Sequence, residues 1–235
     1  MANKTDYSAY RELFARNQIE PDQTALEKLH LYATELIAES ETQNVTAVRT
    51  EPEIWTRHFL DAAYLLRYLP EGTVIDIGTG GGIPGIPLAI LNPKLKITML
   101  DSELRKIEFC RRMIRLLGLD AQAVCGRAEE LSRQPEYEAQ FDFAVSRAMA
   151  SGTILAELSA RFLKVGGTLI AMKGRQYDPA AERFQESAAA LGCCIENDIA
   201  YSLENEPKHL IFVRKNADTP AQYPRRFAKI KRNPL

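Results

Sequence analysis

The sequence has no apolar run approaching the ~20 residues that a membrane-spanning helix needs. Its first residues, MANKTDYSAYRELF, lack the apolar segment of a secretory signal. There are four cysteines but no C-x-x-C pair, and adjacent cysteines such as Cys193 and Cys194 rarely bond to each other because that geometry is strained. We therefore expect no membrane span, no secretion and reduced thiols in the cytoplasm.

Internal repeats and low-complexity blocks are also missing, and only three histidines occur. No histidine–carboxylate arrangement typical of general base catalysis is evident, and we expect no metal site. The 235 residues are 46% hydrophobic and 26% charged, which is ordinary for a globular protein and argues against a largely disordered chain. This length suits one large domain, alone or with a small accessory part.

Charge is balanced over the whole chain but not along it. The net charge is −1, yet residues 214–235 hold seven basic residues and one acidic residue. A basic end on an acidic body indicates either a polyanionic partner or a solvated, disordered terminus, and composition rates the two equally. Tyr223 and Phe227 lie among these cations, which favours RNA slightly because bases stack on aromatic side chains.

The first seventy residues have helical periodicity. Apolar residues recur at helical spacing over residues 26–37, and Thr24 with Glu27 forms a possible capping box at the start of that helix. A second helix is expected from about Pro52 to Tyr68, because proline is favoured in the first turn of a helix.

After Gly72 the pattern alternates between strands and helices. The expected strands cover residues 73–77, 96–100, 121–125, 141–146, 168–172, 193–201 and 209–214, and the expected helices cover residues 102–117, 154–162 and 179–191. Such alternation predicts a parallel sheet with right-handed crossovers. The short link between the last two strands makes them antiparallel to each other.

The strongest motif is the run DIGTGGGIPG, residues 76–85, at the end of the first expected strand. Glycines there allow a sharp turn and a close approach to a ligand, which in such sheets binds beyond the carboxyl ends of the strands. The dinucleotide pattern G-x-G-x-x-G fails from Gly78, because Ile83 stands at the third glycine. Read from Gly80, the same pattern fits, but it begins two residues later than Gly78 and includes Pro84. An acid followed by G-x-G-x-G does fit, and this resembles motif I of Rossmann-like S-adenosylmethionine (SAM) methyltransferases.

Asp101 lies at the end of the second expected strand, twenty-three residues after Gly78. A carboxylate there can accept hydrogen bonds from both ribose hydroxyls. The alternative role is a helix N-cap, although Ser102 could serve in that place. NAD would use the same acid, so Asp101 indicates an adenosyl ligand without choosing between SAM and NAD.

Further motifs occur in order along the chain. They are RHFLD (57–61), LDS (100–102), RAE (127–129), SRA (146–148), MKG (172–174), YPRR (223–226) and the terminal NPL (233–235). Together with residues 76–85, these resemble the bacterial 16S rRNA (guanine-N7) methyltransferase family, methyltransferase G of the small subunit, once called glucose-inhibited division protein B. One departure is the W-N-x-x-x-N-L-T stretch of many relatives, which reads AESETQNVT over residues 38–46. It bears on the N-terminal surface rather than on the cofactor site.

The resemblance implies a Rossmann-like SAM-dependent methyltransferase fold of the α/β class. We expect a mainly parallel seven-stranded sheet with an antiparallel last strand. The expected parts are an N-terminal helical extension (1–70), a SAM-binding domain (71–216) and a basic C-terminal tail (217–235). The implied reaction transfers a methyl group from SAM to N7 of a guanine in the 530 loop of 16S rRNA, at rRNA position 527.

The resemblance also implies the site residues. The expected cofactor-binding residues are Asp76, Gly78, Gly80, Gly82, Ile83, Asp101, Ala128, Glu129 and Arg147. The expected RNA-binding residues are Arg57, His58, Arg127, Lys173, Arg225, Arg226, Lys229 and Lys231. Arg147 and Lys173 are expected to position the substrate, since guanine N7 carries an in-plane lone pair and needs no general base. Without the resemblance, the sequence favours a different role for these two cations, as salt-bridge partners on loops.

The expected partner is 16S rRNA or the 30S ribosomal subunit. We expect the protein to act as a monomer in the cytoplasm and to have no membrane partner. Two other functions stay open. An NAD-dependent oxidoreductase would need a nicotinamide site and acid–base residues that the sequence does not display. A non-catalytic RNA-binding module would use the basic tail on a vestigial fold.

Overall fold

The computed structural model describes residues 6–235. The first five residues belong to the expected N-terminal extension and to the stretch that lacks a secretory pattern, and they lie outside the described residues. Within residues 6–235, no helix combines the length and the apolar character needed to cross a bilayer.

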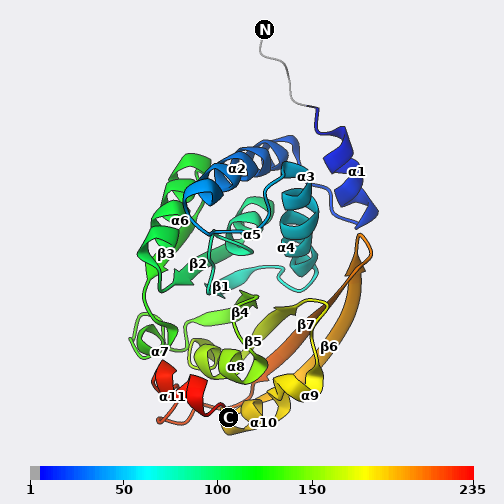
Figure 1. Ribbon diagram of the computed structural model, residues 1–235. Helices are drawn as coiled ribbons and strands as arrows, with labels where there is room; N and C mark the ends of the chain where they lie inside the picture. Colours follow the sequence, from blue (N-terminus) through cyan, green and yellow to red (C-terminus); the bar gives the residue numbers. More distant parts are fainter. Residues whose placement is uncertain (1–5) are drawn as a thin grey trace.

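A seven-stranded sheet with the order β3-β2-β1-β4-β5-β7-β6 forms the centre of the molecule (Figure 1). The strands are β1 (Gly72–Ile77), β2 (Leu95–Asp101), β3 (Ala121–Cys125), β4 (Phe141–Arg147), β5 (Leu163–Lys173), β6 (Cys193–Leu203) and β7 (Glu206–Lys215). Strands β1 to β5 pair in parallel, whereas β7 runs antiparallel to both β5 and β6. The expected mainly parallel sheet with an antiparallel last strand is confirmed.

Helices cover both faces of the sheet (Figure 1). The helices after β1 are α5 (Gly85–Leu91), α6 (Leu104–Leu117), α7 (Ala128–Leu131), α8 (Gly152–Ser159), α9 (Pro179–Glu182), α10 (Phe184–Ala190) and α11 (Phe227–Arg232). Side chains alternate across a strand, so Val74 packs into the core beneath α5 and α6, while Ile75 and Ile77 pack into the core beneath α8 and α10. The carboxyl ends of the parallel strands therefore meet at one edge, between two helical layers.

The N-terminal helices pack on the same face as α5 and α6 (Figure 1). They are α1 (Ser8–Arg16), α2 (Gln23–Thr42), α3 (Glu51–Ile54) and α4 (Leu60–Tyr64), and a π-helical turn (Trp55–Phe59) joins α3 to α4. Trp55 is fully buried, and its ring stacks on Tyr10 with centroids 4.0 Å apart. These helices share the large core of the sheet, which fixes them relative to the strand ends.

The start of α2 differs from the expected capping box. Asp22, not Thr24, is the N-cap residue, and its carboxylate accepts a hydrogen bond from the Ala25 backbone N–H at 2.7 Å. The capping-box prediction is wrong because aspartate is an equally good cap and stands two residues earlier. The helix expected from Pro52 to Tyr68 exists as one helical run, widened at residues 55–59.

Candidate active site

The glycine-rich turn connects β1 to α5, and the strand end beneath it is built around the buried Asp76. One Asp76 oxygen accepts hydrogen bonds from the Thr79 hydroxyl (2.6 Å) and from the Gly85 backbone N–H (2.9 Å). These bonds tie both ends of the turn to the strand end. Burial raises the pKa of Asp76 to about 7, against the opposing effect of these hydrogen bonds.

Glycine is required in the turn by both conformation and space. Gly78, Gly80 and Gly82 have φ angles of +72°, +58° and +95°, which strain other residues. A Cβ atom on Gly78 would lie 2.6 Å from Met149 Cγ, and one on Gly82 would lie 2.4 Å from Ile86 Cδ1. The glycines of this turn therefore allow it to pack closely against Ile86 of helix α5 and Met149 of the loop after β4.

A cavity of about 360 Å³ opens above this turn. It is lined by Ile77, Gly78, Gly80, Leu100, Asp101, Ser102, Glu103, Lys106, Gly126, Arg127, Ala128, Glu129, Ala148, Met149, Ala150, Leu158 and Phe227. One Asp101 oxygen accepts from the Gly80 backbone N–H (3.0 Å), and the other accepts from the Glu103 backbone N–H (3.0 Å). We call this space the turn cavity. Its volume falls within the range of small-molecule sites.

The expected cofactor-binding residues divide into three groups in the structure. Those that line the turn cavity are Gly78, Gly80, Asp101, Ala128 and Glu129. Asp76, Gly82 and Ile83 are absent from the lining of the turn cavity formed by residues 6–235, and Asp76 and Gly82 support the turn from below. Arg147 lines a neighbouring cavity instead.

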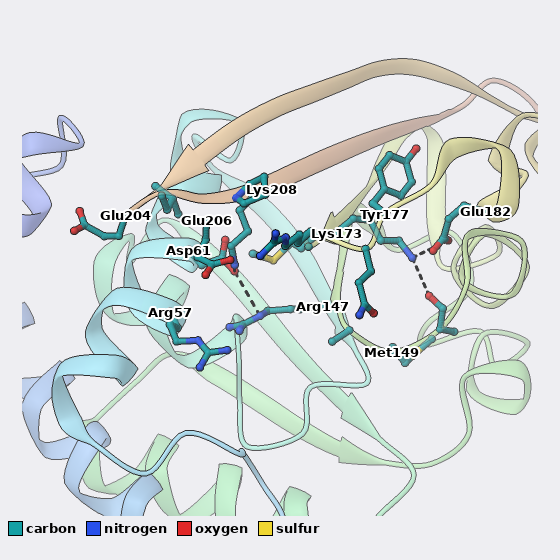
Figure 2. Close-up of a pocket in the computed structure, with 18 of the residues that line it drawn as sticks. Arg57, Asp61, Arg147, Met149, Lys173, Tyr177, Glu182, Glu204, Glu206 and Lys208 are labelled. Atoms are coloured by element: carbon teal, nitrogen blue, oxygen red, sulfur yellow. Dashed lines mark hydrogen bonds and ion pairs between the residues drawn. The ribbon is translucent and has the colours of Figure 1, made fainter.

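That neighbouring cavity, about 860 Å³, is rich in charged side chains (Figure 2). Its lining includes Arg57, Arg147, Lys173, Arg175 and Lys208, together with Asp61, Glu182, Glu204 and Glu206. We call it the charged cavity. Residues 148–150, which follow β4, line both cavities and form the boundary between them.

Arg147 is held by a buried carboxylate (Figure 2). Asp61 lies 3.5 Å from Arg147 Nε and 3.1 Å from Lys208 Nζ, and it also accepts from the Tyr201 hydroxyl at 2.9 Å. The Asp61 side chain is 3% exposed, so the two cations compensate a charge removed from water. A second guanidinium nitrogen of Arg147, Nη1, is buried without a hydrogen-bond partner among residues 6–235.

Lys173 has a comparable arrangement at the opposite side of the charged cavity (Figure 2). Its ammonium donates to Glu182 and to the Ala150 carbonyl oxygen, both at 2.9 Å. The Lys173 and Glu182 side chains are 12% and 19% exposed. The salt bridges that the sequence favours for Arg147 and Lys173 therefore exist, and they fix both cations at the wall of a cavity.

The remaining expected RNA-binding residues lie in different surroundings. Arg57 is exposed at the rim of the charged cavity. His58 is buried, with Nε2 2.8 Å from the Thr46 hydroxyl, and burial with the nearby Arg147 charge lowers the His58 pKa to about 3. The Arg127 guanidinium lies over the Phe227 ring, 5.9 Å from its centroid. Arg225 pairs with the buried Glu157, whereas Arg226, Lys229 and Lys231 are exposed.

Several residues of the two cavities carry no sequence signal that places them there. Lys208 and Glu182 stand in ordinary polar stretches, and only the fold brings them beside Asp61 and Lys173. Phe227 stands in the basic tail, far from the turn in the sequence, yet it lines the turn cavity. The RHFLD motif contains Asp61, but motif spacing does not reveal its partners.

A family model and the relatives compared with this chain carry the same family description. A family model described as rRNA small subunit methyltransferase G matches residues 25–210. The protein named ribosomal RNA small subunit methyltransferase G of Alkaliphilus metalliredigens is 37% identical over 220 residues, which cover 91% of this chain and 92% of the relative. The protein of the same name from Desulfitobacterium hafniense is 35% identical over 223 residues, covering 94% and 93%.

Solved structures share the fold at low identity. A geranyl diphosphate methyltransferase in complex with SAM has a TM-score of 0.51 and 14% identity, over 67% of this chain and 85% of its own. A branched-chain polyamine synthase mutein from Thermus thermophilus has a TM-score of 0.58 and 13% identity, over 80% and 64%. These likenesses concern the fold alone, and the expected Rossmann-like methyltransferase fold is confirmed.

Proposed function

The chain belongs to the rRNA small subunit methyltransferase G family, and on that premise we propose that it transfers a methyl group from SAM to N7 of a guanine in the 530 loop of 16S rRNA. The observation that carries this proposal is the meeting of two cavities at residues 148–150. One has the lining that suits an adenosyl cofactor, and the other has cations and carboxylates that suit a nucleobase joined to phosphates.

The turn cavity fits SAM by its chemistry. Glycines keep the floor free of side chains, and the Asp101 carboxylate stands at the strand end where ribose hydroxyls are bound in such folds. We assign Gly78 and Gly80 to the amino-acid part, Asp101 to the ribose, and Ala128 with Glu129 to the adenine. When bound there, SAM supplies an electrophilic methyl carbon on a sulfonium sulfur.

The reaction requires orientation rather than proton removal. Guanine N7 has an in-plane lone pair and is nucleophilic at neutral pH, so the residues of the charged cavity need only hold the base against the boundary at residues 148–150. Alignment of this kind lowers the barrier by converting an encounter into an intramolecular step. The guanine must leave its stacked position in the RNA to enter.

The Lys173–Glu182 pair has the donor and acceptor pattern that guanine requires. Guanine presents an acceptor, O6, beside the donors N1–H and N2–H₂, and Lys173 and Glu182 present a donor and an acceptor 2.9 Å apart. We assign Lys173 to O6 and Glu182 to the two donors. Adenine has the opposite pattern on this edge, so the pair would discriminate against it.

The buried Asp61 cluster gives Arg147 its role. Asp61 fixes the guanidinium from one side, and the part of Arg147 that lines the charged cavity can donate to an RNA oxygen. Arg57 at the rim and the exposed tail cations Arg226, Lys229 and Lys231 suit contacts to the phosphate backbone, whose contribution falls with salt. Both cavities are formed within one chain, which supports action as a monomer, in the cytoplasm where 30S subunits occur.

The testing experiment incubates the protein with labelled SAM and unmethylated 30S subunits, or with naked 16S rRNA. Borohydride and aniline cleavage then locates N7-methylguanine. We expect one cleavage site, in the 530 loop. Label at another base or atom would overturn the assigned reaction, and calorimetric binding of NADH in place of SAM would favour an oxidoreductase.

Variants of the charged cavity test the residue roles. Lys173→Ala and Glu182→Gln should keep the Kd for SAM and lower the methylation rate by at least tenfold. The matched control is Glu186→Gln, an exposed glutamate paired with Arg183 outside the charged cavity. Wild-type turnover by Glu182→Gln would remove that residue from the guanine site.

A further inference from the structure

The C-terminal segment, residues 217–235, is packed against the methyltransferase fold. Its helix α11 lies beside α8 (Figure 1), and Ile230 of that helix is fully buried. The family model ends at residue 210, so this segment lies outside the matched part of the chain. Its position therefore has to be explained from the contacts it makes here.

A buried ion pair fixes the segment at its centre. Arg225 donates from Nε to one Glu157 oxygen (2.8 Å) and from Nη2 to the other (2.5 Å), and the Arg225 backbone N–H also reaches Glu157 (2.8 Å). Glu157 belongs to α8, and its side chain is 0% exposed. A two-pronged arginine–carboxylate contact of this kind has a defined orientation. Arg225 is thus committed to the protein interior rather than to solvent.

Two arginines of the body bind the same segment through its backbone. Arg133 Nη2 donates to the Pro224 carbonyl oxygen at 2.8 Å, and Arg161 Nε donates to the Tyr223 carbonyl oxygen at 2.9 Å. Residues 223–225 are therefore anchored to the body by Glu157, Arg133 and Arg161. These contacts fix the position from which α11 begins.

Phe227, at the start of α11, lies at the turn cavity. Phe227 is the first residue of α11, two residues after Arg225, and it lines the cavity together with Gly78, Gly80 and Asp101. Arg127, which directly precedes Ala128 and Glu129, lies over the Phe227 ring at 5.9 Å. The ring therefore stands at the part of the cavity assigned to adenine.

We propose that residues 217–235 complete the cofactor site, with the Phe227 ring as the wall on which the adenine of SAM rests. This rests on the proposed function, since it takes SAM as the occupant of the turn cavity. A flat apolar ring can stack face to face with a base, which the polar edges of the cavity cannot do. Such stacking is open to any base, because every base has a flat π-face. Arg225 and Glu157 are positioning residues, because they act by placing Phe227.

The first test measures SAM binding by calorimetry with the full-length chain. We expect Phe227→Ala to raise the Kd about tenfold, and Phe227→Tyr to restore most of the affinity because the ring is kept. Arg232→Ala is the matched control, since it alters an exposed residue of the same helix that lines neither cavity. Urea unfolding of each variant checks that the fold is intact. Equal affinity of Phe227→Ala and wild type would overturn the inference, whereas a wild-type protein that does not bind SAM would instead overturn the proposed function.

A spectroscopic test reports the contact itself. The chain has one tryptophan, Trp55, buried in the N-terminal core, so Phe227→Trp adds an indole at the cavity. Stacking of adenine on that indole should quench its emission saturably with SAM and also with adenosine, but not with methionine. Quenching no greater than in wild type, at concentrations where calorimetry detects SAM binding, would contradict stacking at residue 227.

Discussion

Asp101 performs two tasks within the protein before any ligand is considered. Its two oxygens accept the backbone N–H groups of Gly80 and Glu103, so the carboxylate joins the glycine turn to the start of α6. It also lines the turn cavity. Neither Asp101 nor Ser102 is the N-cap residue of α6, which is Glu103, so that alternative is wrong. Asp101 instead accepts the Glu103 N–H just before the helix, and its contact with ribose stays a prediction.

Replacing this carboxylate should separate the two tasks. We expect Asp101→Ala to weaken SAM binding by at least tenfold, because the ribose acceptor and the tie to Gly80 are lost together. Asp101→Asn keeps an amide oxygen for the Gly80 N–H and should lie between the two. Calorimetric Kd values measure this, and an unchanged Kd for Asp101→Ala would exclude the residue from the site.

His58 offers a pH-dependent prediction. Burial lowers its pKa from 6.5 to about 3, so the unfolded state binds the proton more readily in that interval. The buried, neutral His58 stabilises the fold fully above pH 6.5. This stabilisation decreases as the pH falls toward 3, and the loss at pH 5 is about 2 kcal/mol. Urea unfolding at pH 7.5 and pH 5 should show a smaller loss for His58→Asn than for wild type. Equal losses in the two proteins would contradict a buried, neutral His58.

Single elements were more predictable than single contacts. The expected strands and helices after Gly72 match the observed ones within a few residues, except that β5 begins five residues earlier and a break at Arg183 divides the helix expected over residues 179–191. Local pattern carries this information, because alternating apolar residues and glycine stops act within a few residues. The Asp22 cap was missed because a second good cap residue stands two residues before Thr24, and the π-helical turn was missed because no sequence pattern marked it.

The glycine turn is an element whose stability can be tested. Gly82→Ala places a Cβ 2.4 Å from Ile86 Cδ1 at a φ of +95°, so we expect a loss of about 2–4 kcal/mol from backbone strain and overpacking. Gly174→Ala is the control, because no atom lies within 4 Å of its added Cβ. Denaturant titration gives both values, and equal stability of the two variants would show that the turn is not packed as described.

At the scale of the whole molecule, Asp61 joins three distant parts of the chain. It lies in the N-terminal helices and contacts Arg147 at the end of β4, Tyr201 of β6 and Lys208 of β7. No local pattern could reveal a contact across 147 residues. The charged cavity was therefore the part of the site that sequence reasoning reached least, although it identified Arg147 and Lys173 through family motifs.

Removing this charge should loosen the whole assembly. Asp61→Asn leaves two cations without a counter-charge, and we expect a loss of roughly 1–3 kcal/mol in the free energy of unfolding, less than for a fully enclosed pair because the cations line an open cavity. Asp120→Asn is the control, since its carboxylate is 75% exposed beside Lys96. Chemical denaturation compares them, and a loss no larger than that of the control would mean that Asp61 does not join the parts.

The placement of Phe227 and Lys208 has a consequence for the synthesis of the protein. Both cavities take part of their walls from the last thirty residues of the chain, although the glycine turn and the first strands are translated much earlier. When β1 to β5 have emerged from the ribosome, the nascent chain contains the floor of the cofactor site, but neither cavity is complete. If Phe227 completes the cofactor site as proposed, we expect competence for methyl transfer only after residue 227 has been synthesised and this end has folded back onto α8.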